Sequence, residues 1–217
     1  MSAGNAAAVR VKICGVTNEQ DAEDAAALGA DALGFNLYPG SKRYIDLKKE
    51  SAWIRALPPF ITKVAVMCNA TIAEAEAVFD LTYIDMVQFH GHEDEKFCAH
   101  FANAGLPFIK AVAARDEAAL KDLGRFGTNH ILIDAWSPDA FGGTGRTIEA
   151  ALLKQFTRDP AHHLILSGGL TPSNVRAAVE GIFPYAVDVA SGVEIAPGRK
   201  DKALIREFIL AARGLEG

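Results

Sequence analysis

Short apolar runs rich in β-branched residues alternate with longer stretches of helical periodicity along the whole chain. Eight such runs have the length and composition of buried strands, and each is followed by a candidate helix. The predicted strands are Val9 to Cys14, Asp31 to Leu37, Lys63 to Cys68, Asp85 to His90, Phe108 to Val112, His130 to Asp134, His163 to Ser167 and Val187 to Ala190. The helices are predicted to begin near Asn18, Leu47, Thr71, Glu93, Asp116, Thr147, Pro172 and Asp201.

This regular alternation predicts an α/β fold with a parallel sheet, and eight units are the number that closes the sheet into a (β/α)8 TIM barrel. We expect a single domain over residues 1–217, with residues 1–8 as a flexible N-terminal extension. An open doubly wound sheet is the alternative, but no Gly-x-Gly-x-x-Gly follows the first strand.

Strand parity predicts which side chains face the interior of the barrel, because successive residues point to opposite sides of a strand. On the first strand Lys12 and Cys14 are expected inward, and on the sixth strand Asp134 is. On the eighth strand Asp188 lies on the side opposite to Val187 and Val189. Cys14 and Asp134 each end a strand, so both should lie at the C-terminal mouth. The same reasoning turns four more polar residues inward, which are Asn36, Gln88, His90 and Lys110. Enclosing so many polar groups is costly unless they meet each other or a ligand, so the mouth is the candidate site.

Composition and charge narrow the range of functions. The net charge is -5, from 27 acidic and 22 basic residues spread over the chain, which argues against nucleic-acid binding. No segment has the signature of a signal peptide or membrane span, so we expect a cytoplasmic protein with no membrane partner. The cysteines Cys14, Cys68 and Cys98 show no Cys-x-x-Cys spacing, and His90-Gly91-His92 lacks a third ligand, so no metal site is predicted.

Glycine-rich turns follow the last three predicted strands. In this fold the loops after strands seven and eight commonly bind a phosphate group through backbone N–H groups. The predicted contacts are therefore Gly142, Gly143, Gly145, Gly168, Gly169, Ser191 and Gly192. A small phosphosugar is the expected substrate.

The opening motif Lys12-Ile13-Cys14-Gly15-Val16-Thr17 resembles that of the phosphoribosylanthranilate isomerases. Further segments, in the order of that family, carry the resemblance from Val11 to about Ile209. They are Gly29-Ala30-Asp31-Ala32-Leu33-Gly34-Phe35, Val87-Gln88-Phe89-His90-Gly91, Gly142-Gly143-Thr144-Gly145, Ser167-Gly168-Gly169-Leu170, Val187-Asp188-Val189-Ala190-Ser191-Gly192-Val193-Glu194 and Pro197-Gly198-Arg199-Lys200-Asp201.

The resemblance implies an Amadori rearrangement in tryptophan biosynthesis, with Cys14 as general base and Asp134 as general acid. It also places Asp188 in the pocket and implies that Arg43 receives the aromatic carboxylate of the substrate. Proton transfer of this kind implies no cofactor. A thiol needs local positive potential to ionise, and the inward-facing Lys12 is the nearest candidate for supplying it.

The sequence departs from the family pattern at two places, and two alternative functions are also considered. Lys42 stands before Arg43 where the family has proline, and Arg146-Thr147-Ile148-Glu149-Ala150 replaces an aromatic and acidic run. The alternatives are a histidine-pathway isomerase acting on another aminated ribose phosphate, and a non-catalytic barrel that binds a phosphate ligand. Either a monomer or a homodimer fits the sequence.

Overall fold

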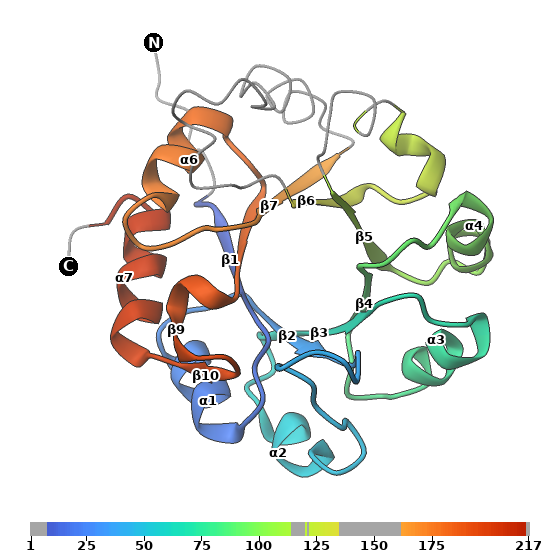
Figure 1. Ribbon diagram of the computed structural model, residues 1–217, viewed down its shortest axis with the longest axis horizontal. Coiled ribbons are helices and arrows are strands. Elements are labelled where there is room, and N and C mark those ends of the chain that lie inside the picture. The colour runs from blue at the N-terminus through green and yellow to red at the C-terminus, as the bar shows by residue number, and fades with distance from the viewer. Residues whose placement is uncertain (1–7, 114–119, 121, 135–161, 216–217) are drawn as a thin grey trace.

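The computed structural model describes residues 8–113, 120, 122–134 and 162–215, and in these the predicted barrel is confirmed. Eight strands pair in parallel in chain order, and β8 closes the ring against β1 (Figure 1). The strands are β1 Arg10–Cys14, β2 Ala32–Asn36, β3 Thr62–Met67, β4 Met86–Phe89, β5 Phe108–Ala113, β6 His130–Asp134, β7 His163–Ser167 and β8 Ala186–Val189.

Helices lie outside the ring of strands (Figure 1). They are α1 Glu19–Ala27, α2 Ser51–Ala56, α3 Ile72–Phe79, α4 Glu95–Asn103, α6 Val175–Ile182 and α7 Lys202–Ala212, with short 3-10 helices η2 Leu123–Phe126 and η4 Ser191–Val193. Asn18, Thr71 and Asp201, near which helices were predicted to begin, cap three of them. The helices predicted near Asp116 and Thr147, and residues 1–7 of the predicted extension, lie outside the described residues.

Two helices begin later than predicted because polar side chains first turn the chain. Before α2, the carboxylate of Asp46 accepts hydrogen bonds from the backbone N–H groups of Lys48 and Lys49, so the helix begins at Ser51. Before α6, the backbone N–H of Thr171 donates to the side chain of Asn174, and the helix follows this turn.

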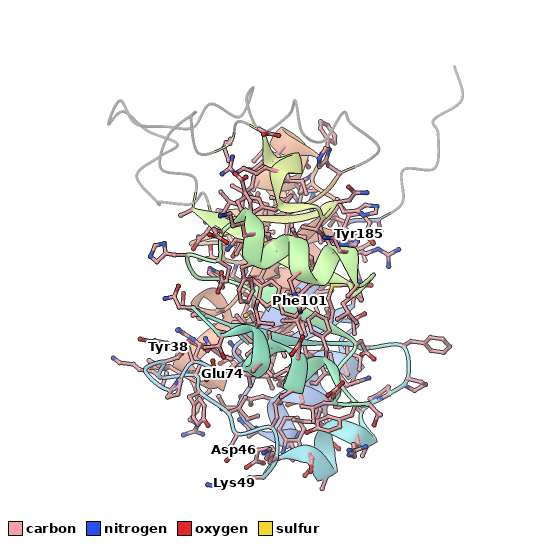
Figure 2. The ribbon with its side chains drawn as sticks, turned by 90° about the vertical axis from the view of Figure 1, so that its right-hand side faces the viewer. Tyr38, Asp46, Lys49, Glu74, Phe101 and Tyr185 are labelled. Atoms are coloured by element: carbon pink, nitrogen blue, oxygen red, sulfur yellow. The ribbon has the colours of Figure 1, made fainter. Side chains whose placement is uncertain are left out.

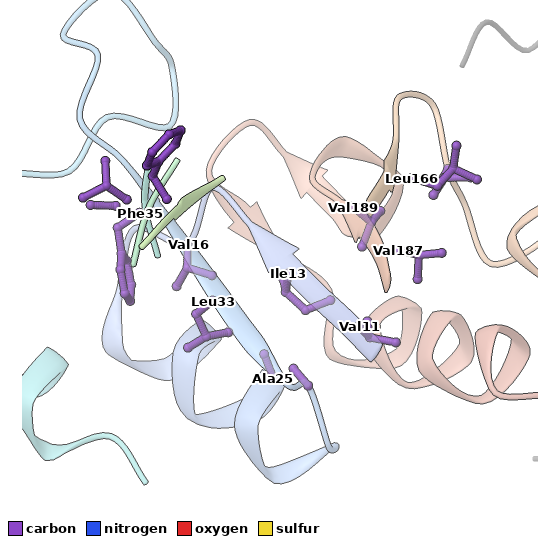
Figure 3. Packing of buried hydrophobic residues seen from close by; sticks show 14 of the residues in the cluster. Val11, Ile13, Val16, Ala25, Leu33, Phe35, Leu166, Val187 and Val189 are labelled. Carbon is purple, nitrogen blue, oxygen red and sulfur yellow. The ribbon is translucent and has the colours of Figure 1, made fainter. Parts of the chain in front are cut away.

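The apolar core has two layers, one on each side of the strands. Val11, Ile13 and Val187 belong to the large cluster that packs between strands and helices (Figure 3). A smaller cluster fills the inside of the barrel and consists of Val64, Ile109, Ala111, Leu132, Ile165 and Ala186. This division confirms the predicted parity of the first, sixth and eighth strands, which leaves Lys12, Cys14, Asp134 and Asp188 on the inner side.

The inward prediction for Lys110 is wrong. Lys110 shares its parity with Phe108 and Val112, which belong to the outer cluster, while its neighbours Ile109 and Ala111 face inward. Its ammonium donates to the carboxylate of Glu93 at 2.8 Å and to the carbonyl of Gly91 at 2.9 Å. Lys110 therefore supports the loop after β4.

A small two-stranded sheet after β8 is a feature that the sequence did not predict. β9 Glu194–Ala196 and β10 Arg199–Lys200 are antiparallel and are joined at Pro197 and Gly198, where φ is +81°. The hairpin brings Lys200 back beneath the end of β1.

Tyr38, after β2, and Tyr185, before β8, lie toward opposite ends of the barrel (Figure 2). None of the helices in the described part of the chain is long and apolar enough to cross a membrane.

Candidate active site

A cavity of about 360 Å³ opens at the C-terminal ends of the strands. Its lining combines Cys14 from β1, Asp134 from β6 and Asp188 from β8 with the glycines that follow β7. Asn36 and His90, both expected inward, also line it. The two residues proposed from the sequence as base and acid therefore face one cavity. This is the arrangement that a reaction on a single small molecule requires.

The thiol of Cys14 lies beside the ammonium of Lys12, and a glycine on the next strand leaves room for both. A Cβ atom at Gly34 would be 2.8 Å from Sγ of Cys14 and 3.0 Å from Nζ of Lys12. Burial raises the pKa of the Cys14 thiol, and Asp188 raises it further, while Lys12 and Lys200 lower it. The net pKa is above the ordinary value, so the two lysines only partly offset burial.

Asp188 is buried and holds Lys12 in place. Its carboxylate accepts hydrogen bonds from Nζ of Lys12 at 2.6 Å and from the hydroxyl of Ser167 at 3.0 Å. Burial lowers the pKa of Lys12, but the carboxylate of Asp188 and the thiol of Cys14 outweigh this, and the net pKa is raised. Lys12 therefore stays a cation inside the barrel, between an anion and the thiol.

Asp134 lies on the opposite side of the cavity next to His90. Nε2 of His90 is 3.8 Å from Oδ2 of Asp134, and Nδ1 of the same ring is 2.7 Å from the side-chain nitrogen of Gln88. The Asp134 side chain is 44% exposed. Its carboxylate is therefore accessible from the mouth of the cavity.

The structure places several residues of the predicted glycine-rich rim at the cavity. Gly168 and Gly169 have φ of +95° and +60° and line the cavity together with Ser191. Gly192 lies close behind, because a Cβ there would come within 1.9 Å of the carbonyl oxygen of Leu170. This close approach of two backbones requires glycine. Gly142, Gly143 and Gly145 lie outside the described residues.

Arg43 also lines the cavity, but an internal carboxylate already holds one edge of its guanidinium. Its Nε donates to Oε1 of Glu194 at 2.8 Å and its Nη2 to Oε2 at 2.6 Å. Lys200 donates to Oε1 of Glu194 at 2.8 Å and to the carbonyl of Cys14 at 2.6 Å. Sequence reasoning missed Glu194 and Lys200, although both stand in the quoted motifs, because both follow the last predicted strand, where strand parity assigns no direction.

A second cavity of about 850 Å³ shares Cys68, His90 and Asp134 with the first and so adjoins it. It continues over the loop after β4, along His92 and Glu93. Among the described residues no group of three or more His, Cys, Asp or Glu side chains could hold a metal ion.

Comparison with known proteins gives one consistent result. The family model of N-(5'phosphoribosyl)anthranilate (PRA) isomerase matches residues 11–211. The chain is 42% identical over 205 residues to N-(5'-phosphoribosyl)anthranilate isomerase of Pelobacter propionicus, covering 94% of this chain and 96% of the relative. For the corresponding protein of Geobacter metallireducens the identity is 44% over 208 residues, with coverage of 94% and 99%.

Solved structures agree with these relatives. The crystal structure of phosphoribosyl anthranilate isomerase from Thermotoga maritima superposes with a TM-score of 0.84 at 41% identity, covering 95% of this chain and all of that one. A phosphoribosyl anthranilate isomerase in complex with reduced 1-(o-carboxyphenylamino)-1-deoxyribulose 5-phosphate superposes with a TM-score of 0.82 at 39% identity, with the same coverage. This chain therefore belongs to the N-(5'-phosphoribosyl)anthranilate isomerase family.

Proposed function

We propose that this isomerase converts N-(5'-phosphoribosyl)anthranilate into 1-(2-carboxyphenylamino)-1-deoxyribulose 5-phosphate, a step of tryptophan biosynthesis. The observation that carries the proposal is the shared cavity, which a thiol from β1 and a carboxyl from β6 line together with a glycine rim. The complex of a relative with the reduced form of this product supports the same substrate class.

In the proposed reaction Asp134 is the general acid. Its carboxyl donates a proton to the ring oxygen of the ribose, the bond from that oxygen to C1 breaks, and the nitrogen lone pair forms an iminium at C1. The proton ends on the sugar hydroxyl and Asp134 is left as a carboxylate. His90, whose Nε2 is 3.8 Å from Oδ2 of Asp134, is a group that can donate toward this carboxylate.

Cys14 is the general base of the second step. As a thiolate it removes the hydrogen from C2, and the electron pair moves to neutralise the iminium, which gives an enolamine. Protonation at C1 and loss of the hydroxyl proton at C2 then give the amino-ketose. Every step moves only electron pairs within the substrate and protons between the substrate and these side chains or water, so the proposal needs no cofactor.

Other cavity residues would bind the substrate. Gly168, Gly169 and Ser191 line the side of the cavity suited to the phosphate, with Gly192 close behind and the undescribed Gly142, Gly143 and Gly145 proposed from the sequence. Asp188 is proposed to fix the sugar or to stabilise the cationic intermediate, since its carboxylate already balances Lys12 there. Arg43 is proposed to receive the carboxylate of the aromatic ring.

The test is loss of substrate fluorescence after mixing the protein with freshly made phosphoribosylanthranilate. Cys14→Ala and Asp134→Asn should each reduce kcat by about a thousandfold or more, because each removes a proton-transfer group. Binding of a phosphate-bearing product analogue should persist in both variants.

Three outcomes would contradict the proposal or part of it. Turnover of the histidine-pathway substrate alone would assign the other isomerase activity, and analogue binding without turnover of either substrate would leave a binding protein. Undiminished turnover in both variants would remove Cys14 and Asp134 from the mechanism. The monomer or homodimer predicted from the sequence is a separate question for light scattering; one solved relative is described as dimeric, from Thermotoga maritima.

A further inference from the structure

The ion-pair group formed by Arg43, Glu194 and Lys200 lies at the cavity wall but outside the proton-transfer chemistry. Three separate segments supply it, since Arg43 follows β2, Glu194 begins β9 and Lys200 ends β10. The side chains of Glu194 and Lys200 are 4% and 1% exposed, whereas that of Arg43 is 27% exposed. Two members are therefore buried, and the third is presented to the cavity.

Lys200 fixes the position of the Glu194 carboxylate. Its ammonium donates three hydrogen bonds, to the carbonyls of Cys14 and Ala190 and to Oε1 of Glu194, at 2.6, 3.1 and 2.8 Å. An ammonium has three hydrogens, so these contacts use all of its donors. Glu194 is thereby tied to the ends of β1 and β8, which carry the site.

Glu194 in turn determines how Arg43 is held. The carboxylate takes the edge of the guanidinium that carries Nε and Nη2, in a bidentate pair. Burial raises the pKa of Glu194, but Arg43 and Lys200 outweigh it and the net pKa is lowered, so the carboxylate stays an anion. The stem of Arg43 crosses Gly15, where φ is +73° and a Cβ would come within 2.4 Å of Cδ. The arginine thus has little freedom to turn.

The remaining edge of Arg43 is the one with Nη1 and the second hydrogen of Nη2. Among the described residues no protein group accepts a hydrogen bond from Nη1, and Arg43 lines the cavity. The group holds two cations and one anion, so a positive charge is left over on the cavity side. A planar carboxylate could pair with this edge without displacing Glu194.

We infer that Glu194, anchored by Lys200, is a positioning residue that makes the reaction specific for substrates with a carboxylate on the aromatic amine. It acts through Arg43, by leaving one edge of the guanidinium toward the substrate and holding it still. This inference rests on the proposed function, and it adds the residue that sets the preference. Holding a charged donor in place before binding increases affinity because less conformational freedom is lost.

The experiment compares two substrates, phosphoribosylanthranilate and the analogue N-(5'-phosphoribosyl)aniline, which lacks the carboxylate. In Glu194→Gln, kcat/KM for the carboxylated substrate should fall by about tenfold to a hundredfold, mainly through KM, because a held charge contact is loosened. For the aniline analogue kcat/KM should change by less than about threefold. Asp24→Asn is the matched control, since it removes the exposed pair of Asp24 with Lys202 and should leave both values unchanged.

An equal loss on both substrates in Glu194→Gln would mean that Glu194 has only a structural role, and no loss on either would also overturn the inference. If Glu194→Gln does not fold, Glu194→Asp keeps the charge next to Lys200 but shortens the reach to Arg43, and the same selective loss is expected. Failure of the proposed function would look different, because the unmodified protein would then not convert phosphoribosylanthranilate at all.

Discussion

Cys14 lies among charges that shift its pKa in opposite directions. Burial and Asp188 raise the pKa, and Lys12 and Lys200 lower it, with a net increase. Below its pKa the thiolate fraction grows about tenfold per pH unit, so the rate of alkylation should rise with pH beyond the range of an ordinary thiol.

Lys12→Met should raise the pKa of Cys14 further, because the variant removes the nearest positive charge. The measurement is the rate of iodoacetamide labelling against pH, with Cys68→Ser and Cys98→Ser as background. Asp188→Asn is the opposite control and should lower the pKa. Titrations that coincide in all three proteins would remove Lys12 from the account of how Cys14 ionises.

At the level of single residues, strand parity predicted which side chains face the cavity on several strands. It failed where the direction or exposure of a side chain depends on neighbouring parts of the structure. Cys14, Asp134 and Asp188 face the cavity as parity requires. Lys110 does not face inward, because the fifth strand is apolar on both sides and alternation alone gives no inner face. The exposure of Asp134 could not be predicted either, since it depends on which segments cover the mouth.

At the scale of elements, the contact between β1 and β2 depends on a glycine. Gly34 pairs with Cys14 across the sheet, and a Cβ there would lie 2.8 Å from Sγ and 3.1 Å from Cα of Cys14. Gly34→Ala should therefore displace the thiol and reduce kcat by about a hundredfold, the usual effect of moving a reacting group by about 1 Å.

Gly181→Ala in α6 is the control for this substitution. An added methyl group there meets nothing within 4 Å, and alanine in a helix should stabilise the protein by about 0.5–1 kcal/mol without changing kcat. Urea unfolding measures the stability of both variants, and the loss of substrate fluorescence measures their kcat. Together they separate an effect on stability from an effect on kcat. Full activity in Gly34→Ala would show that the thiol does not need its present position.

The eight strands were predictable because each is a run of apolar residues between turn signals, and all eight are found. Helix starts were predictable where a capping side chain marks them, as at Thr71, whose hydroxyl and Glu74 form a capping box. The hairpin of β9 and β10 was not, because strands of three and two residues carry no period. That hairpin is what brings Lys200 to the active site.

At the scale of the whole molecule, Asp31 joins the beginning of the barrel to its last helix, at the end far from the site. Its Oδ2 accepts hydrogen bonds from the backbone N–H of Val11 at 2.7 Å and from Nη2 of Arg213 at 2.9 Å. In this fold the N-terminal face serves stability and the C-terminal face serves catalysis.

Asp31→Ala should therefore lower the free energy of unfolding by about 1–3 kcal/mol, since it leaves a buried donor without its acceptor, and kcat should stay unchanged. Urea unfolding measures the first and the fluorescence assay the second. Lys49→Ala, which removes the exposed pair with Asp46 and keeps the carboxylate that turns the chain, is expected to cost less than about 1 kcal/mol. A large loss of kcat in Asp31→Ala would mean that the two faces of the barrel are coupled.

The contacts of Lys12 with Asp188 and of Lys200 with Cys14 join positions 176 and 186 residues apart. During synthesis the first strand leaves the ribosome long before its partners exist, and the lysine and thiol it carries must wait for the last strand and hairpin. A nascent chain that stops short of residue 200 can form most of the barrel's local pairings but cannot assemble a working enzyme. The site of this polypeptide is therefore complete only after residue 200 has been made.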